Sequence, residues 1–273
     1  MKVAYLGPRG TFSEEAATRF FPKNTELFPK KSIYDAIEAV SIDDVDKCIV
    51  PIENSIAGTI DTSIDGLMMF NLSIDADVIF PVSLNLIGLK GSEISDINEV
   101  ISITPALDQC RNYIRHHKFL SQHVDSTANA AKLIMEQGNK NRAAIASEWV
   151  AGLYGLQIIE KDIQDSEHNH TRFIVLSKNH RIKKIQDKTM ILVTPSTEYV
   201  GMLSSILNVF SGLGINLTWI ESKPTRKKLG TYRFFIEAEM GYDEERAQKV
   251  KIILETFGHK VDFLGSYKTT ILK

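Results

Sequence analysis

Residues 165–179, DSEHNHTRFIVLSKN, hold the densest set of groups that could do chemistry. His168 and His170 lead into Thr171, Arg172 and Phe173, and an apolar run follows. A guanidinium can hold a carboxylate through two parallel hydrogen bonds, and a histidine can titrate near neutral pH. The same pattern also fits an ordinary strand start preceded by a solvated loop, so the stretch alone does not decide between a site and a loop.

Three other stretches place polar groups where elements begin or end. GPRGTFSE and DSTANAA precede helical patterns, and a helix start offers free N–H groups and a positive dipole end to an anion. PIENSIAG puts Glu53, Asn54 and Ser55 after a buried strand, at the end where open α/β sheets bind ligands. Plain capping or a simple turn explains each stretch without a ligand. The sequence carries no P-loop or Rossmann fingerprint, serine triad or metal-ligand cluster.

The first 180 residues alternate strands with helices, which predicts open α/β sheets. Apolar runs indicate strands at residues 2–6, 47–51, 101–104, 143–146 and 172–176. Helices are indicated at residues 11–21, where Thr11 and Glu14 have capping-box spacing, and at residues 125–138, which end on glycine.

The last 85 or so residues follow a different order. Strands are indicated at residues 189–195, 215–224, 231–240 and 259–267, with helices at residues 201–214 and 243–258. This βαββαβ order is the ferredoxin-like arrangement. The helices are expected to bury one face each, made of Leu203, Ile206, Leu207 and Phe210 and of Val250, Ile253, Leu254 and Phe257. The basic stretch 177–188 is interpreted as an interdomain linker rather than a phosphate contact.

Composition limits the function classes. A length of 273 residues favours two domains, and 43% hydrophobic with 24% charged residues is typical of a globular protein. The net charge of −2 argues against nucleic-acid binding. No signal peptide or membrane-length apolar run is seen. Cys48 and Cys110 are expected to be reduced, in the cytoplasm. These features leave a small-anion enzyme and a solute-binding regulator open.

Six motifs together resemble the prephenate dehydratase family. They stand in that family's order and rough spacing: YLGPRGTFSEEAA, VPIENSIAGTI, DSTANAA, AAIAS, YGLQII and HNHTRFIVLS. GINLTWIESKP and YRFFIE are similar to the family's ACT regulatory domain. The resemblance covers nearly the whole chain.

The resemblance implies a fold and a domain layout. Residues 1–178 are expected to form a catalytic domain like a type II periplasmic binding protein. Lobe one would hold about residues 1–78 plus 171–178, and lobe two about residues 80–165. Residues 179–188 would link this domain to a ferredoxin-like ACT domain at residues 189–273.

The resemblance also implies an activity. The chain would convert prephenate to phenylpyruvate in L-phenylalanine biosynthesis, as a carbon–oxygen lyase without metal or cofactor. L-Phenylalanine would regulate it, in a homodimer or homotetramer, with no nucleic-acid or membrane partner. A chorismate mutase segment is not expected. Arogenate dehydratase and a non-catalytic amino-acid-binding regulator remain alternatives, whereas an extracytoplasmic receptor would need an export signal.

Residue roles carry over from the matched motifs. Thr171 would donate to the leaving oxygen, Arg172 would hold a carboxylate or support that grip, and Phe173 would supply apolar surroundings. The helix starts are expected to bind the substrate carboxylates, through Thr11, Phe12, Ser13, Ser126 and Thr127. The PIENSIAG turn is expected to orient the ring, through Asn54 and Ser55. The expected effector residues are Gly201, Met202, Leu203, Asn216, Leu217, Thr218, Glu221 and Ser222.

The sequence departs from the family pattern in places. Ala57 stands where the family commonly has glutamate, so that carboxylate is not essential here. SITPALDQC lacks the usual histidine before its proline. In the ACT motifs Met202 replaces alanine and Lys223 replaces arginine, which is not a neutral change at a bidentate contact.

Overall fold

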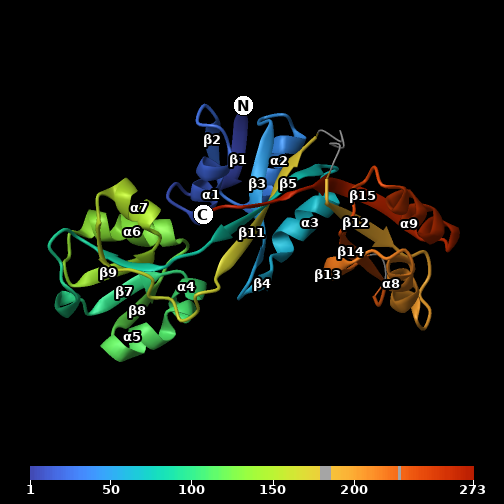
Figure 1. Cartoon of the computed structure of the whole chain (residues 1–273). Helices are drawn as coiled ribbons and strands as arrows, with labels where there is room; N and C mark the ends of the chain where they lie inside the picture. The colour runs from blue at the N-terminus through green and yellow to red at the C-terminus, as the bar shows by residue number, and fades with distance from the viewer. Residues whose placement is uncertain (179–185, 227–228) are drawn as a thin grey trace. The chain divides into compact units, whose positions relative to one another are not determined.

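The computed structural model describes residues 1–178, 186–226 and 229–273, and strands alternate with helices through the first 177 residues (Figure 1). A seven-stranded sheet has the order β16-β5-β11-β3-β1-β2, with β4 paired to β3. Strand β1 is parallel to both β2 and β3. The elements are β1 Lys2–Leu6, α1 Phe12–Phe20, β2 Glu26–Lys30, α2 Ile33–Ser41, β3 Lys47–Asn54, β4 Gly58–Thr59, α3 Asp61–Met69, β5 Ser73–Pro81, β11 His170–Ser177 and β16 Thr269–Ile271.

Between β5 and β11 the chain forms a second sheet with the order β10-β6-β9-β7-β8. Its strands are β6 Asn85–Gly88, β7 Glu99–Ser102, β8 Leu120–His123, β9 Arg142–Ala146 and β10 Gln157–Glu160. The helices are the 3₁₀ turn η1 Ile94–Asp96, α4 Thr104–Gln109, α5 Arg111–His117, α6 Thr127–Gln137 and α7 Glu148–Tyr154. Adjacent residues Val100 and Ile101 enter different apolar clusters, so both faces of this sheet are covered.

The chain passes between these sheets twice, at residues 82–84 and 161–169. The backbone N–H of Val82 donates to the carbonyl of Asn169 at 2.8 Å. The two crossing segments are therefore hydrogen-bonded to each other. This arrangement delivers β11, and with it Thr171, to the first sheet directly from the second.

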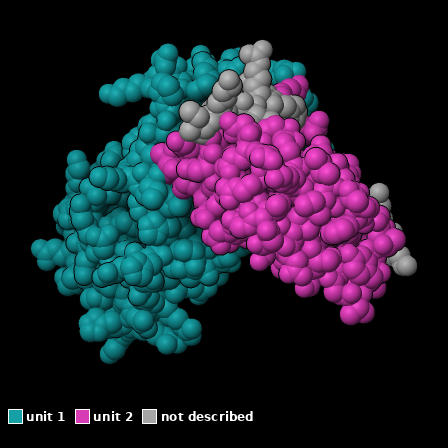
Figure 2. Space-filling view, turned by 45° about the vertical axis from the view of Figure 1, so that its right-hand side comes forward, with its two compact units in different colours: residues 1–70, 78–174, 271–273 teal, residues 71–77, 175–270 magenta. Residues whose placement is uncertain are grey.

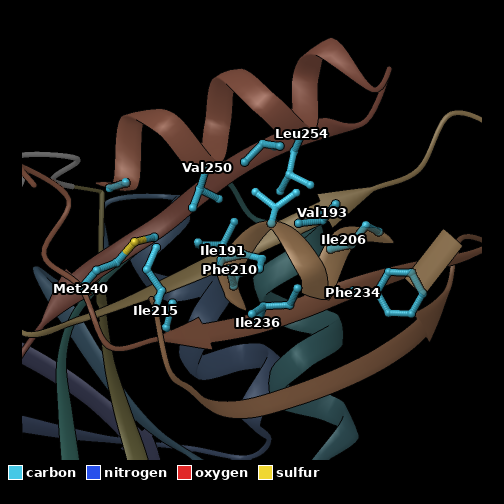
Figure 3. Packing of buried hydrophobic residues seen from close by; sticks show 14 of the residues in the cluster. Ile191, Val193, Ile206, Phe210, Ile215, Phe234, Ile236, Met240, Val250 and Leu254 are labelled. Carbon is cyan, nitrogen blue, oxygen red and sulfur yellow. The ribbon is translucent and has the colours of Figure 1, made fainter. Parts of the chain in front are cut away.

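The third sheet is antiparallel, with the order β13-β14-β12-β15. Its elements are β12 Lys188–Thr194, α8 Met202–Gly212, β13 Leu217–Pro224, β14 Tyr232–Ala238, α9 Glu245–Thr256 and β15 Lys260–Tyr267. Figure 3 shows the apolar cluster between this sheet and its helices, which includes Ile191, Phe210, Ile236, Val250 and Leu254. The predicted α/β fold class is confirmed, and the ferredoxin-like βαββαβ order is observed.

Two of the expected helix-face residues are exposed. Leu203 is 38% exposed because α8 begins at Met202 and buries Met202, Ile206, Val209 and Phe210 instead. Phe257 is 54% exposed because α9 ends at Thr256, so the helical period no longer applies to it. Both predictions placed an apolar residue one position away from the buried stripe or beyond the helix end.

The chain divides into two compact units (Figure 2). The first contains residues 1–70, 78–174 and 271–273, and the second contains residues 71–77 and 175–270. Residues 71–77 join the second unit because β5 packs on β15: a Cβ at Gly265 would lie 2.2 Å from the carbonyl oxygen of Ile74. Thr269 Oγ1 also donates to Asp77 Oδ2 at 2.7 Å. Residues 179–185 of the expected linker lie outside the described residues.

Candidate functional site

The side chain of Asn54 connects the end of β3 to the start of β11. Its Oδ1 accepts the backbone N–H groups of Ile56 and Ala57 at 3.1 and 3.0 Å, which fixes the orientation of the amide. Its Nδ2 therefore faces β11 and donates to Thr171 Oγ1 at 3.1 Å. Because Thr171 accepts this bond, its own hydroxyl proton remains available to donate. Position 57 contributes its backbone N–H, which alanine supplies as well as glutamate would.

Asn169 extends this network and was missed by the sequence reasoning. Its side chain is buried at 2% exposure and accepts from Asn54 Nδ2 at 2.9 Å. It donates to Gln109 Oε1 at 2.7 Å. Gln109 is one of the polar residues of the altered SITPALDQC segment. The sequence signal was present, since Asn169 stands inside HNHTRF, but the bond to a residue 60 positions earlier cannot be read from it.

Ser55 holds the loop before β11 through its hydroxyl. Its Oγ donates to the carbonyl of His168 at 2.7 Å and accepts the backbone N–H of His170 at 2.9 Å. Its own backbone N–H donates to the carbonyl of His170. These contacts use the backbone of both histidines and explain how an exposed serine orders the segment that presents Thr171.

Arg172 lies on the opposite face of the sheet from Thr171, because successive residues of a strand point to opposite faces. Its guanidinium is 3.9 Å from the carboxylate of Glu53, and its side chain is 12% exposed. Glu53 is likewise the neighbour of Asn54 on β3. Each strand thus contributes one residue to the polar network and one to the ion pair behind it. This placement favours the supporting role for Arg172 over direct contact with a ligand at Thr171.

Three aromatic rings in contact with one another, here called the aromatic series, begin at Phe173, two residues after Thr171 on β11. Phe173 is on the same face, is 1% exposed and meets Phe80 edge to face with ring centroids 6.5 Å apart. Phe80 contacts Phe12 in the same way at 6.3 Å, and Arg19 lies over the Phe80 ring at 5.4 Å. Phe12 also packs against the apolar cluster under α4. The series connects the start of β11 to the start of α1.

The first turn of α1 is capped by its own side chains. Thr11 Oγ1 accepts the N–H of Glu14 and donates to the carbonyl of Leu6 at 3.0 Å. The Glu14 carboxylate accepts the N–H of Gly10 at 2.6 Å and the hydroxyl of Tyr5 at 3.1 Å. Burial and the nearby Glu14 raise the pKa of the Tyr5 hydroxyl. At this end the N–H groups of the first turn, rather than the Thr11 hydroxyl, are left to bind an anion.

Helix α6 offers a second anion-binding start. The Ser126 hydroxyl accepts the N–H of Asn129, and the first turn has no acidic residue. Ser126 and Thr127 are buried at 9% and 5% exposure. The Asp125 carboxylate just before the cap accepts from Asn129 Nδ2 at 2.8 Å. The remaining N–H groups and the dipole end of α6 offer a place for an anion, as those of α1 do.

Gly10 brings the two helix starts together. Its φ is +89°, and a Cβ there would lie 2.6 Å from Val150 Cγ2 in α7 and 3.2 Å from Ala128 Cβ in the first turn of α6. The turn before α1 therefore lies directly against α6. The structure thus joins the predicted substrate residues into two groups, Asn54 with Thr171 and the start of α1 with that of α6, and the aromatic series links them.

Other residues of the altered SITPALDQC segment serve packing. Ala106, Leu107 and Cys110 are buried in the apolar cluster of the second sheet. Burial raises the pKa of the Cys110 thiol to about 12, so it stays protonated near neutral pH. Within the described residues, no group of three or more histidines, cysteines and acids is placed to hold a metal ion.

The predicted effector residues occupy two places in the second unit. Gly201, with φ +85°, precedes α8, where Met202 is buried and Leu203 exposed. The others lie before or on β13, the edge strand of its sheet. Thr218 Oγ1 donates to Glu237, which is 1% exposed, and Glu237 also accepts from Lys188 Nζ at 3.1 Å and Tyr267 at 2.8 Å. Sequence reasoning gave no sign of this buried acid.

Comparison with known proteins places the chain among named relatives. The family model described as prephenate dehydratase matches residues 3–181. The arogenate dehydratase/prephenate dehydratase 2 of Arabidopsis thaliana is 39% identical over 285 residues, covering all of this chain and 74% of the relative. The prephenate dehydratase structure from Staphylococcus aureus superposes with a TM-score of 0.90 at 38% identity, covering 98% of this chain and 100% of that one. The prephenate dehydratase from Arthrobacter aurescens, solved in complex with L-Phe, gives 0.90 at 31%, covering 98% and 90%. Among the described residues, no helix is long and apolar enough to cross a membrane.

Proposed function

The chain belongs to the prephenate dehydratase family, and on that premise we propose that it is a carbon–oxygen lyase that converts prephenate to phenylpyruvate. The observation that carries the proposal is the geometry at Thr171. Its oxygen accepts from Asn54 Nδ2 at 3.1 Å, so its proton is available to a leaving oxygen. The buried ring of Phe173 lies on the same face.

The reaction needs few groups from the protein. Prephenate has a ring carboxylate, a pyruvyl carboxylate and a ring hydroxyl. As the ring carboxylate leaves as carbon dioxide, its bonding electrons move into the ring and expel the hydroxyl, which takes up a proton and leaves as water. The ring becomes aromatic, which drives the reaction without an oxidant. Thr171 stabilises negative charge on the leaving oxygen by hydrogen bonding, since its own pKa is too high for a strong acid.

The helix starts fit the two carboxylates. The first turn of α6 carries no acid, and Ser126 and Thr127 lie in it. The first turn of α1 adds the N–H groups of Phe12 and Ser13. Arg172, paired with Glu53, would support β11 from behind rather than contact the substrate. Phe12 gives the site an apolar side. Apolar surroundings favour loss of the charged ring carboxylate as neutral carbon dioxide.

The ferredoxin-like part of the second unit fits an ACT-type regulatory module. We infer that it binds L-phenylalanine between paired copies in a homodimer or homotetramer, with Gly201–Leu203 from one element and the segment 216–222 from another. The Arthrobacter aurescens relative was solved with L-Phe. Among the described strands β13 stands at the edge of its sheet, and an edge strand can receive a second copy.

Arogenate is the second candidate substrate. The Arabidopsis thaliana relative carries both activities in its name, and arogenate differs from prephenate only in an amino group on the side chain. A non-catalytic amino-acid-binding regulator would use the same folds without the Thr171 hydroxyl. Cys48 and Cys110 are buried and form no disulfide within the described residues, which fits a reducing cytoplasm.

One assay separates these candidates. Purified full-length protein is given prephenate or arogenate, with and without L-phenylalanine, and product formation is followed. Prephenate is expected to have the higher kcat/KM, and L-phenylalanine to lower the rate. A higher kcat/KM for arogenate would make arogenate the substrate in place of prephenate. If neither compound were turned over, the non-catalytic amino-acid-binding regulator would be the remaining candidate.

A further inference from the structure

We propose that Asn169 is a positioning residue: through Asn54, its amide holds the Thr171 hydroxyl in the orientation that donates to the leaving oxygen. The inference rests on the proposed function and deepens it. The side chain of Asn169 bonds to Asn54, which in turn bonds to Thr171, so Asn54 is the route by which Asn169 is inferred to act.

Both ends of the Asn169 side chain have fixed partners. Its Oδ1 accepts from Asn54 Nδ2 at 2.9 Å, and its Nδ2 donates to Gln109 Oε1 at 2.7 Å. At 2% exposure, water cannot replace these partners without rearrangement. The backbone carbonyl of Asn169 accepts from Val82, which ties the residue to the other crossing segment.

The direction of each bond follows from the one before it. Two backbone N–H groups fix Asn54 Oδ1, so Asn54 presents its N–H groups to Asn169 and β11. Asn169 must then offer an oxygen to Asn54 and an N–H to Gln109. A side chain with one acceptor and one donor at this reach is needed, and alanine offers neither.

Asn54 Nδ2 has two hydrogens but three acceptors, the side-chain oxygens of Asn169 and Thr171 and the carbonyl of His170. The Asn169 oxygen takes one of these hydrogens and so fixes the tilt of the Asn54 amide, which aims the other hydrogen at Thr171 and the carbonyl. Without Asn169 the amide stays held at its oxygen but can tilt toward the His170 carbonyl. Thr171 then loses a fixed donor, and its own proton is no longer held in one direction. Since this proton matters most as charge builds on the leaving oxygen, the loss is expected in kcat more than in KM.

The first test is Asn169→Ala in the full chain. We expect kcat for prephenate to fall about tenfold or more, with KM changed about threefold or less. Asn85→Ala is the matched control. Asn85 is 1% exposed and also bridges two segments, donating to Ala146 O at 3.3 Å and accepting from Asp162 N–H at 3.2 Å. It should lower the thermal midpoint without lowering kcat.

The second test is a double-mutant cycle with Thr171→Ala, measured under single-turnover conditions so that small residual rates are resolved. If Asn169 acts through Thr171, then Asn169→Ala causes no further loss in the Thr171→Ala background. An equal loss in both backgrounds overturns the inference while leaving the proposed function intact. Full activity of Thr171→Ala would remove the donor role of Thr171 and this inference with it, whereas no prephenate turnover by the parent protein would remove the proposed function.

A smaller change guards against misfolding of the alanine variant. Asn169→Ser keeps a polar hydroxyl in the buried site, but its side chain is one bond shorter than the amide and has a single oxygen, so it cannot hold Asn54 and Gln109 together. It should fold and show the same fall in kcat. Wild-type kcat in a folded Asn169→Ser protein would contradict the positioning role.

Discussion

At the residue scale, the hydroxyl of Thr171 is the group whose role the structure defines best. Thr171→Val keeps the shape of the side chain and removes the hydroxyl, and Thr171→Ser keeps the hydroxyl. We expect valine to lower kcat by about 10²–10³, as loss of one transition-state donor does, and serine to retain most activity. Steady-state kinetics with circular dichroism as a folding control measures both, and near-normal turnover in the valine variant would exclude Thr171 as the donor.

His259 gives the second unit a pH-dependent stability. It is 3% exposed, and neither ring nitrogen has a hydrogen-bond partner within the described part of the chain. Burial lowers its pKa below the ordinary value. The unfolded chain therefore takes up a proton first as the pH falls. Stability present above about pH 6.5 is lost toward lower pH, by up to about 1.4 kcal/mol per pH unit.

His259→Leu should remove this dependence. Between pH 7.5 and 5.5 the thermal midpoint of the variant is expected to fall less than that of the parent. His116→Gln, at an exposed position on α5, is the control and should behave like the parent. Equal falls in parent and His259→Leu would show that other groups govern the acid response.

Residue types in a motif were predictable from sequence, but their partners were not. Thr171 and Asn54 could be named because each stands at a strand end. The Asn54–Asn169–Gln109 bonds join residues 115 and 60 positions apart, and only the fold brings these together. Arg172 shows the reverse case: its type suggested a carboxylate grip, while strand alternation places it behind the sheet with Glu53.

At the element scale, the approach of α1 to α6 depends on Gly10. We expect Gly10→Ala to raise KM for prephenate about tenfold or more, equivalent to about 1.4 kcal/mol of binding. The added Cβ would lie 2.6 Å from Val150 Cγ2, and valine is too short and stiff to turn away, so the two helix starts must separate. Steady-state kinetics of the variant and the parent measures the change.

Gly138→Ala is the matched control for Gly10. Gly138 also has a positive φ, +62°, but a Cβ there meets no heavy atom of the described residues within 4 Å. Its backbone strain costs about 1 kcal/mol of stability without moving α1, so KM should stay at the parent value. If both alanine variants raise KM alike, backbone strain rather than helix separation explains the effect.

Long elements with a regular hydrophobic period were predictable from the sequence, and short strands with distant partners were not. The strands and helices of the last 85 residues follow from hydrophobic period and glycine stops. Strand β16 has only three residues, and it pairs with β5, nearly 200 positions earlier. Such a pairing leaves no local pattern. Leu203 and Phe257 show that periodicity finds a helix more reliably than the phase of its buried stripe or its last residue.

At the scale of the whole molecule, the chain combines a two-sheet α/β unit with a ferredoxin-like unit, and β5 and β11 contribute residues to both. The sequence predicted the two fold types because their orders of strand and helix differ. It placed the start of the regulatory domain at residue 189, which stays a prediction. The second compact unit contains residues 71–77 and 175–270. The missing side chain of Gly265 lets β15 lie against Ile74, a long-range contact that no local pattern reveals.

The ferredoxin-like unit exposes apolar side chains on or before α8, on β13, and before or on β14, and these are candidates for contact with the second copy proposed above. They are Tyr199, Val200, Leu203, Ile220, Leu229 and Tyr232. Ile220 is 43% exposed on edge strand β13. A charge at this position should leave the isolated chain folded, because the side chain already faces solvent, and should prevent pairing along the edge.

Ile220→Lys is therefore expected to reduce the oligomer in light scattering, abolish the effect of L-phenylalanine and leave prephenate turnover unchanged. Ile252→Lys is the control, since Ile252 is 63% exposed on α9 and a charge there lies away from β13. It should keep the oligomer and the response. If Ile220→Lys remains oligomeric and inhibited, the copies pair through another surface. If it loses the oligomer but is still inhibited by L-phenylalanine, the effector site is complete within one chain.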